Sequence, residues 1–333
     1  MGNKKIGVLT SGGDAPGMNN AVAAIVKACR YNNVEVVGVN YGYRGLLDGD
    51  IFDIAGMDTD DIINRGGTIL GSARCLEFKE PESVKKAVEV AKANAIDGMI
   101  VIGGDGSFRG ARDLSLAGLP TIGIPATIDN DISCTEYTLG YDTALNTVID
   151  CCDKISDTMR SHNRTAFVEV MGNKAGYLAV EVAIACGADA VLVAEQNFDI
   201  EKNIVDVIAK KYEEKKHFMI IVAEGVEKVS GKSTKKIMNE TVEMINKKYG
   251  IQLDAKLTVL GHIQRGGKPT YKDRIAASRM GADAVKLLIN GIGNRVVALQ
   301  NGKVVDYDIL EALDMKKSIE DELLMLSKII CEK

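Results

Sequence analysis

Two segments rich in glycine and aspartate carry the residue types that phosphoryl transfer requires. The first, GGDGS at 103–107, follows the apolar run MIVI at 99–102, which is typical of a buried strand. Adjacent glycines let backbone amides approach a polyphosphate, and the helix expected after Ser107 adds the positive end of its dipole. Asp105 supplies a carboxylate oxygen for a hard cation that bridges phosphates. The segment therefore predicts a phosphate site at a strand end.

The second segment, PATIDND at 125–131, follows the apolar run TIGI at 121–124. It places the carboxylates of Asp129 and Asp131 beside the hydroxyl of Thr127, and a kinase needs such a base for the attacking hydroxyl. Taken alone, a glycine turn is more often a generic anion nest, and aspartates are common turn or N-cap residues. Two such segments at strand ends of one βαβ unit favour a ligand site, because open parallel sheets bind ligands outside the carboxyl ends of their strands.

A third strand end has the same character. KIGVL at 5–9 leads into TSGGDAPG at 10–17 and then into a helical stretch at 18–30. An ordinary capped turn between strand and helix is the alternative interpretation. Three such turns contain more glycine than packing needs, so we expect a second wall of the nucleotide site here, with Gly13 allowing close backbone approach.

Strand-like and helical stretches alternate along nearly the whole chain, which predicts an α/β protein with mainly parallel sheets. A length of 333 residues is sufficient for two domains. The expected strands are 6–9, 34–39, 99–102, 121–124, 166–170, 190–193, 218–222, 257–260 and 295–299. The expected helices are 18–30, 141–160, 175–186, 202–216, 235–248 and 271–289.

Composition excludes several classes of function. The net charge of −5, without any block of basic residues, provides no surface for nucleic acid, and tryptophan is absent. No apolar run approaches the ~18 residues of a membrane span, and no signal peptide precedes the first strand, so we expect a cytoplasmic protein without membrane contact. The seven cysteines contain no CxxC pair and predict reduced thiols, and the three histidines lie too far apart for a zinc site.

Two motifs suggest other nucleotide sites. GKSTKK at 231–236 imitates part of a P-loop, but five residues separate its glycine from Gly225 where four are required, so we predict a surface loop. The glycines at 104, 106 and 110 are one residue away from a dinucleotide fingerprint, which keeps an NAD-dependent oxidoreductase as an alternative. A non-catalytic sugar-phosphate sensor is a further alternative, although a sensor needs no metal carboxylate and base together.

Longer motifs resemble the bacterial-type 6-phosphofructokinase family over nearly the whole chain. They are IGVLTSGGDAPGMN at 6–19, INRGGTILGSAR at 63–74, VIGGDGS at 101–107, PATIDNDI at 125–132, EVMG at 169–172 and VLGHIQRGG at 259–267. NAD kinases and lipid kinases share a GGDG-type element but do not resemble the TIDND and GHIQRGG segments. The resemblance implies two doubly wound, mainly parallel-sheet domains with the active site in the cleft between them, in a homotetramer whose subunits share active sites. The nucleotide-binding domain would be 1–140 plus 263–311, and the sugar-phosphate-binding domain 141–262 plus 312–333.

The resemblance also implies the reaction. ATP would transfer its γ-phosphoryl group to the 1-hydroxyl of fructose 6-phosphate, giving fructose 1,6-bisphosphate in glycolysis, with Mg²⁺ as the cofactor. Asp129 would be the general base, Thr127 and Asp131 would lie beside the reacting sugar, and Asp105 would act on the metal. The nucleotide-binding residues would be Gly13, Tyr43, Arg74, Cys75, Gly104, Asp105, Gly106 and Ser107. The substrate-binding residues would be Thr127, Ile128, Asp129, Arg164, Met171, Gly172, Asn173, Glu224, Lys256, His262 and Arg265, with Arg164 reaching from a neighbouring subunit.

The residue types support some of these roles without the resemblance. The planar guanidinium of Arg74 suits a phosphate better than a lysine would, and the GHIQRGG turn provides one imidazole and one guanidinium for a sugar phosphate. Without the resemblance, His262 is better explained as a hydrogen-bonded turn residue and Arg164 as one member of a surface ion pair. Glu224 would be a strand-end carboxylate.

The chain departs from the family at substrate positions. The family motif reads Met-Gly-Arg, whereas Asn173 follows Gly172 here, and Lys256 replaces a second phosphate-binding arginine. We expect weaker transition-state stabilisation, because a neutral amide and a lysine both lack the arginine fork, although Lys174 offers a charge nearby. Pyrophosphate or another sugar phosphate therefore stays an alternative substrate.

Two further departures concern the donor and the effectors. Pyrophosphate users of this family carry an acidic residue where Gly106 stands and a lysine where Ala126 stands, so we expect ATP as the donor. The second nucleotide site of the family, between subunits, uses basic side chains for ADP or phosphoenolpyruvate. At four of those positions this chain has Ala23, Gly56, Ser156 and Glu213, which predicts a weak response to either effector.

Overall fold

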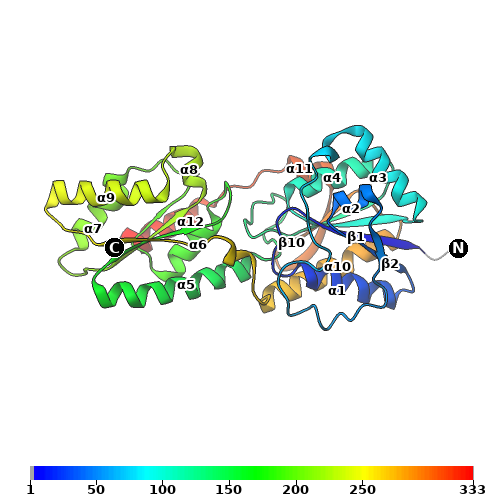
Figure 1. Ribbon diagram of the computed structural model, residues 1–333, viewed down its shortest axis with the longest axis horizontal. Helices are drawn as coiled ribbons and strands as arrows, with labels where there is room; N and C mark the ends of the chain where they lie inside the picture. The colour runs from blue at the N-terminus through cyan, green and yellow to red at the C-terminus, as the bar shows by residue number, and fades with distance from the viewer. Residues whose placement is uncertain (1–3, 333) are drawn as a thin grey trace. The chain divides into compact units, whose positions relative to one another are not determined.

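The computed structural model in Figure 1 describes residues 4–332. They form two compact units, each with its own sheet. The first unit comprises the residues up to Ile128 together with 132–143 and 265–317, and the second comprises 129–131, 144–264 and the residues from Ser318 onward. The expected domain boundaries, 140/141, 262/263 and 311/312, stay a prediction. The chain passes between the two compact units at 143/144, 264/265 and 317/318.

The first unit is built on a seven-stranded sheet of strand order β11-β10-β5-β4-β1-β2-β3. The strands between the two edges are parallel, and the edge strands β3 and β11 run antiparallel to their neighbours. Strands β1, β4 and β5 are buried almost throughout, as expected for a parallel sheet with helices on both faces. The strands are β1 (Lys5–Ser11), β2 (Glu35–Val39), β3 (Ile51–Asp53), β4 (Gly98–Gly103), β5 (Thr121–Pro125), β10 (Arg295–Gln300) and β11 (Lys303–Asp308).

Helices cover both faces of this sheet (Figure 1). On one face, α1 (Met18–Tyr31) packs against α10 (Tyr271–Ile289), and a Cβ at Gly281 would lie only 2.9 Å from the Cβ of Ala24. The missing side chain therefore lets the two helices approach closely. The opposite face carries α2 (Tyr43–Asp48), α3 (Pro81–Ala93), α4 (Asp105–Leu116) and α11 (Ile309–Asp314), and the 3₁₀ helix η1 (Leu76–Lys79) precedes α3.

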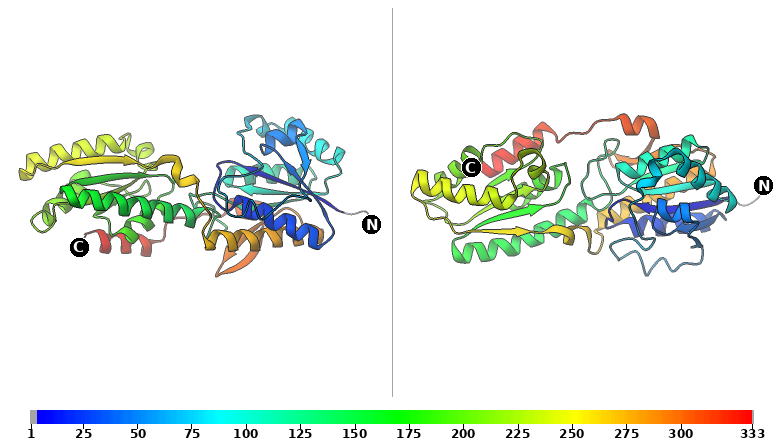
Figure 2. Two further views of the ribbon diagram at one scale, coloured as in Figure 1. Left: turned by 60° about the horizontal axis from the view of Figure 1, so that its bottom comes forward. Right: turned by 45° about the horizontal axis from the view of Figure 1, so that its top comes forward.

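The second unit contains a four-stranded parallel sheet of order β7-β8-β6-β9. Helices α6 and α12 pack together against one face of it, and α7 and α9 lie on the opposite face (Figure 2). The strands are β6 (Thr165–Val170), β7 (Ala190–Leu192), β8 (Phe218–Ala223) and β9 (Ala255–Val259). The helices are α5 (Tyr141–His162, which begins in the first unit), α6 (Tyr177–Cys186), α7 (Asp206–Lys211), α8 (Gly225–Ser230), α9 (Thr234–Tyr249) and α12 (Asp321–Glu332), with a π-helical turn η2 (Glu201–Val205) before α7 and a 3₁₀ turn η3 (Gly261–Arg265) after β9.

The predicted α/β class is confirmed, and each expected strand is present. Two expectations are wrong. The helix expected over 202–216 starts as the π-helical turn η2 and continues as α7, which already ends at Lys211; Lys211 and Lys215 each form an ion pair with Asp189. The loop expected over 231–236 ends early, because the Ser233 side chain accepts the Lys236 amide and starts α9 at Thr234.

The remaining expectations on composition concern thiols and membranes. Each of the seven cysteines is a free thiol, as predicted. Among residues 4–332, no helix combines the length and the apolar character of a transmembrane span.

Candidate active site

The predicted phosphate turns lie side by side in the first unit. The register pairs Ser11 of β1 with Gly103 of β4, and Gly103 with Pro125 of β5, so the carboxyl ends of these three strands are neighbours. The Ala126 amide donates to the Gly103 carbonyl at 3.0 Å. A Cβ at Gly104 would lie 3.9 Å from the Thr127 Cβ, so the glycine turn and the following aspartate-rich segment are in contact here.

The glycine turn leads directly into α4, which begins at Asp105, earlier than the helix start expected after Ser107. Gly104 is the N-cap and provides no side chain, which leaves the first amides of α4 for an anion. A Cβ at Gly103 would lie 2.4 Å from both the Ser107 Oγ and the Ser11 carbonyl oxygen, so only glycine permits this packing. At Gly106 a Cβ would meet nothing within 4 Å, and the residue is exposed. The turn therefore offers amides and open space together.

Asp105 is the one predicted metal-binding residue. Its carboxylate is about half exposed at the first turn of α4 and forms an ion pair with Arg109 at 3.0 Å. Between residues 4 and 332, there is no group of three or more His, Cys, Asp or Glu side chains that would hold a metal by itself. Mg²⁺ in kinases usually takes one or two carboxylates and completes its shell with phosphates and water. A single exposed Asp105 beside the phosphate turn fits that mode of binding.

The second predicted segment passes from one unit to the other between Ile128 and Asp129. Thr127 is 9% exposed and Asp129 is 8% exposed, so both polar side chains lie mostly out of water. The Thr138 hydroxyl donates to the Thr127 carbonyl at 2.6 Å and fixes the backbone there. Ile128, which was predicted to contact the substrate, is fully buried.

Arg265 lies over the first glycine turn within the same unit. Its Nη1 donates to the Asp14 carbonyl at 3.2 Å. A Cβ at Gly13 would meet the same Nη1 at 2.3 Å and Cζ at 3.0 Å. The structure thus brings together a predicted nucleotide-binding glycine and a predicted substrate-binding arginine, and the missing side chain at Gly13 makes room for the guanidinium.

Tyr43, one of the predicted nucleotide-binding residues, contacts the start of α4. The Tyr43 ring is buried and stacks on Phe78, with ring centroids 4.2 Å apart, and its hydroxyl donates to the Ser107 carbonyl. Burial, reinforced by the charge of Asp113, holds the pKa of Tyr43 well above its usual value, so the phenol stays a hydrogen-bond donor. Tyr43 therefore stabilises the first turn of α4 through this hydrogen bond.

Arg74 and Cys75 lie in the segment before η1. The Arg74 side chain is exposed and accessible to a phosphate. The Cys75 thiol is half-buried and lies 3.8 Å from the Glu77 carboxylate. Burial raises the pKa of Cys75, so we expect an un-ionised thiol at this position at neutral pH.

In the second unit, the two predicted phosphate cations share a carboxylate that the sequence did not single out. Arg164 Nε and Lys256 Nζ each lie 2.7 Å from an oxygen of Asp254. Hydrogen bonds from Lys256 and Arg164 hold the pKa of Asp254 below its usual value. Lys256 follows Asp254 by two positions at the start of β9, and this alternation was the signal that could have identified the carboxylate.

The loop after β6 contains the next predicted residues. Gly172 has φ 139°, and a Cβ there would lie 2.3 Å from the Ala175 carbonyl oxygen, so glycine is required twice over. The Met171 amide donates to the Gln264 Oε1 at 3.1 Å, and the Gln264 Nε2 donates to the Gly261 carbonyl at 3.0 Å. Gln264 is fully buried and joins this loop to the turn that carries His262, whose side chain is exposed. Its place within GHIQRGG was the available signal.

Asn173 is held from two directions. The residue is left-handed, with φ 57°, and its amide donates to the Glu224 Oε1 at 2.6 Å. Lys228 Nζ donates to the Asn173 Oδ1 at 2.6 Å and to its carbonyl oxygen at 3.2 Å. Sequence reasoning predicted Glu224 and Asn173 and missed Lys228, although Lys228 follows Glu224 by one helical turn.

Comparisons with known proteins agree with these motifs. The phosphofructokinase family model matches residues 5–288. A protein named ATP-dependent 6-phosphofructokinase from Bacillus mycoides is 48% identical over 325 residues, which cover 98% of this chain and 98% of that protein. The solved structure of phosphofructokinase from Saccharomyces cerevisiae is similar with a TM-score of 0.85 at 30% identity, over 99% of this chain and 48% of the yeast chain. This chain therefore spans about half the length of that yeast protein.

Similarity in fold extends beyond ATP-dependent relatives. The structure of a pyrophosphate-dependent phosphofructokinase from Nitrosospira multiformis has a TM-score of 0.85 at 20% identity, over 99% of this chain and 92% of that chain. At this identity, the likeness shows the fold alone. The family match over residues 5–288, together with the 48% identity to the Bacillus mycoides relative, shows that this chain belongs to the phosphofructokinase family.

Proposed function

We propose that this protein is an ATP-dependent 6-phosphofructokinase, which transfers the γ-phosphoryl group of ATP to the 1-hydroxyl of fructose 6-phosphate. The observation that carries the proposal is the open glycine turn at the start of α4, in contact with the segment that contains Thr127. The Bacillus mycoides relative bears the same activity in its name and matches over 98% of this chain. The product would be fructose 1,6-bisphosphate, an intermediate of glycolysis.

The nucleotide is assigned to residues of the first unit. The amides at the α4 N-terminus and the space at Gly106 would receive the phosphates of ATP, and Arg74 would add a guanidinium. Asp105 would hold Mg²⁺ after releasing Arg109. When bound, Mg²⁺ would neutralise the charge that develops on the donor phosphates.

The sugar phosphate is assigned mainly to residues of the second unit. Asp129 would take the proton of the 1-hydroxyl, and its low exposure would keep competing water away from that proton. Arg164 and Lys256 would bind the 6-phosphate, which must replace Asp254 as their partner. His262 and Arg265 would complete the grip, and the loop that contains Met171, Gly172 and Asn173 would contact the sugar.

ATP is preferred to pyrophosphate on steric and electrostatic grounds. A side chain at Gly106 would project into free space, which is the space that an α-phosphate requires. Ala126 is buried at the end of β5 and presents no cation to a pyrophosphate. The shared fold with pyrophosphate-dependent relatives does not decide between the donors, whereas these two positions do.

The assembly and location of the protein are further parts of the proposal. We expect a homotetramer in which Arg164 of one subunit reaches the sugar phosphate of another, and a location in the cytoplasm. Size-exclusion chromatography with light scattering tests the assembly. Mixing an inactive Asp129→Ser variant with an inactive Arg164→Ala variant tests the shared site. Mixed tetramers should recover activity only if one active site takes Asp129 from one subunit and Arg164 from another.

The activity itself is tested with purified protein, ATP, Mg²⁺ and fructose 6-phosphate, with fructose 1,6-bisphosphate as the measured product. We expect Asp129→Ser to abolish turnover while fructose 6-phosphate still binds, as measured by calorimetry. A sugar-phosphate sensor would bind the sugar without turnover in either form. Absence of product with the unaltered protein would refute the proposal.

A further inference from the structure

We propose that Lys228 is a positioning residue of the phosphoryl-transfer site, which fixes Asn173 and places a positive charge beside it. The inference rests on the proposed function and assigns a residue to that same site. It is carried by the contacts that Lys228 forms with Asn173, which is also held by Glu224.

Glu224 and Lys228 hold Asn173 from one face of a short helix. Glu224 is the N-cap of α8, and Lys228 lies within the helix four positions later. Their side chains therefore project from the same face. The carboxylate of Glu224 accepts the Asn173 amide at 2.6 Å, and the ammonium of Lys228 donates to both oxygens of Asn173, at 2.6 and 3.2 Å. A left-handed asparagine is thereby fixed at its backbone donor, its backbone acceptor and its side-chain acceptor.

Gly225 allows this approach. A Cβ at Gly225 would lie 2.8 Å from the Asn173 carbonyl oxygen, so any side chain there would push the loop away from α8. Gly225 is buried, and relief would require the backbone of the loop to move. The close contact between α8 and the loop is thus built into the sequence independently of Lys228.

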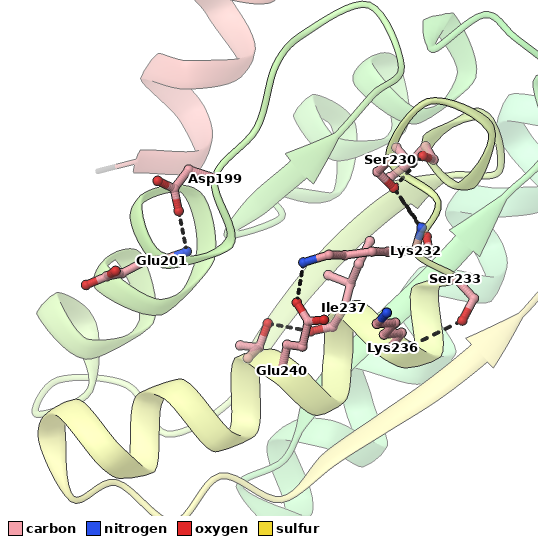
Figure 3. A network of polar contacts seen from close by, with 10 residues as sticks. Asp199, Glu201, Ser230, Lys232, Ser233, Lys236, Ile237 and Glu240 are labelled. Carbon is pink, nitrogen blue, oxygen red and sulfur yellow. Dashed lines mark hydrogen bonds and ion pairs between the residues drawn. The ribbon is translucent and has the colours of Figure 1, made fainter.

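The far end of α8 is anchored as well, although the helix spans only Gly225–Ser230. Figure 3 shows the polar contacts that follow it. The Ser230 hydroxyl donates to the Val226 carbonyl at 2.7 Å and accepts the Lys232 amide at 3.1 Å. Lys232 then pairs with Glu240 of α9 at 2.6 Å. Lys228 is therefore presented from a helix that is fixed at both ends.

These contacts determine what Asn173 can offer to a substrate. Lys228 binds the Oδ1 atom of the Asn173 side-chain amide. The Nδ2 amino group at the other end of that amide is therefore not bound to Lys228. An amide donor next to an ammonium is an electrostatic arrangement suited to a transferring phosphoryl group, whose negative charge is spread over its three equatorial oxygens in the transition state. Lys174, the neighbouring cation expected from the sequence to supply this charge, and Lys228 are both exposed, but Lys228 is the one that donates to the Asn173 side chain, at 2.6 Å.

The experiment compares Lys228→Met with Lys228→Arg, and uses Lys235→Met as the matched control. Lys235 is an exposed lysine of α9, so its replacement removes the same charge away from Asn173. Because the charged hydrogen bond from Lys228 is exposed, its loss in Lys228→Met should lower kcat about tenfold. The KM for fructose 6-phosphate should change less than about twofold, because the contact acts on the transferring group. Lys228→Arg should retain most of the activity, and Lys235→Met all of it.

A binding measurement provides the readout that does not depend on turnover. Fructose 1,6-bisphosphate carries the transferred phosphoryl group, and fructose 6-phosphate lacks it. By calorimetry, Lys228→Met should weaken binding of the bisphosphate about tenfold and leave fructose 6-phosphate within about twofold. In an Asn173→Ala background, the kcat effect of Lys228→Met should fall below about threefold, because its main acceptor is gone.

The measurements can overturn the assignment of Lys228 in two ways. Equal effects of Lys228→Met in both backgrounds, or unchanged kcat and bisphosphate binding, would overturn the assignment and leave the proposed function intact. A loss of melting temperature that Lys228→Arg does not restore would assign Lys228 a purely structural role and overturn the inference. If the unaltered protein neither binds nor converts the sugar phosphates, the proposed function fails first, and this assignment fails with it.

Discussion

Replacement of Gly13 by alanine separates the role of this glycine in the fold from its role in the site. The new Cβ would lie 2.3 Å from the Arg265 Nη1, whereas ordinary contacts begin at 3.4 Å. The guanidinium must therefore move by about 1 Å, and a misplacement of that size can cost about 100-fold in rate. Because the obstructing atoms belong to the end of a flexible side chain, we expect the free energy of unfolding to change by less than about 1 kcal/mol.

The assay is steady-state kinetics with ATP and fructose 6-phosphate, together with chemical denaturation of each variant. We expect kcat/KM for fructose 6-phosphate to fall between about tenfold and 100-fold in Gly13→Ala. Gly56→Ala is the control, because a Cβ at Gly56 meets nothing within 4 Å. Arg265→Ala in the same background completes a double-mutant cycle, and the two changes should be strongly non-additive if alanine acts by displacing the guanidinium.

Two results would refute this reasoning. Unaltered kinetics in Gly13→Ala would show that Arg265 tolerates the displacement or does not contact the substrate. Fully additive losses would show that Gly13 acts on the nucleotide alone, as the sequence by itself suggested.

The remaining predictions concern phosphate binding, the donor, pH and effectors. Asp254→Ala should lower the KM for fructose 6-phosphate several-fold in saturation kinetics, because the 6-phosphate no longer competes with a carboxylate for Arg164 and Lys256. Turnover with pyrophosphate should be negligible beside turnover with ATP, and comparable rates would contradict the roles given to Gly106 and Ala126. The pKa of Asp254 is lowered in the folded protein, so its contribution to stability is present above its unfolded pKa and is lost as the pH falls through the folded value; Asp254→Asn should remove that part of the acid-unfolding profile. Phosphoenolpyruvate should shift the half-saturation for fructose 6-phosphate only slightly, and a large shift would overturn the expectation.

The sequence predicts the fold well where its signals are local. Apolar runs between glycine turns identify β1, β4 and β5, because a parallel strand with helices on both faces must be apolar throughout. The antiparallel edge strands β3 and β11 were not predicted, since a short half-exposed strand such as β3 carries no continuous apolar run. The helix α9 was expected from residue 235, but the loop expected over 231–236 overlapped its first turn, because a lysine-rich segment resembles a loop until Ser233 is recognised as the N-cap.

The residues of the candidate site likewise divide into those with a local sequence signal and those without one. Motif residues such as Gly13, Asp105 and Asn173 are identifiable because they belong to contiguous segments. Their partners are not, since contact depends on strand register and helix face. Asp254 is joined to Arg164 across 90 residues of sequence, and Lys228 to Asn173 across 55.

The second nucleotide site of the family provides the clearest case in which structure strengthens a sequence argument. Beside those four replaced positions, the resemblance to the family leaves three cations to attract an effector, namely Lys27, Lys215 and Lys216. Lys27 is paired with Asp60 at 2.9 Å, and Lys215 with the buried carboxylate of Asp189 at 2.9 Å.

Lys216 lies 3.8 Å from the centre of the Tyr212 ring and 3.9 Å from Glu213. An anionic effector would have to displace a carboxylate from each of these lysines before gaining any attraction. The exposed pair with Asp60 is weak and screened, but the pair with Asp189 is not, because separating it would leave a buried carboxylate without one of its cations. Since an effector regulates only through its differential binding to two states, a site with four replaced positions and with Lys215 held by a buried carboxylate has little free energy with which to couple.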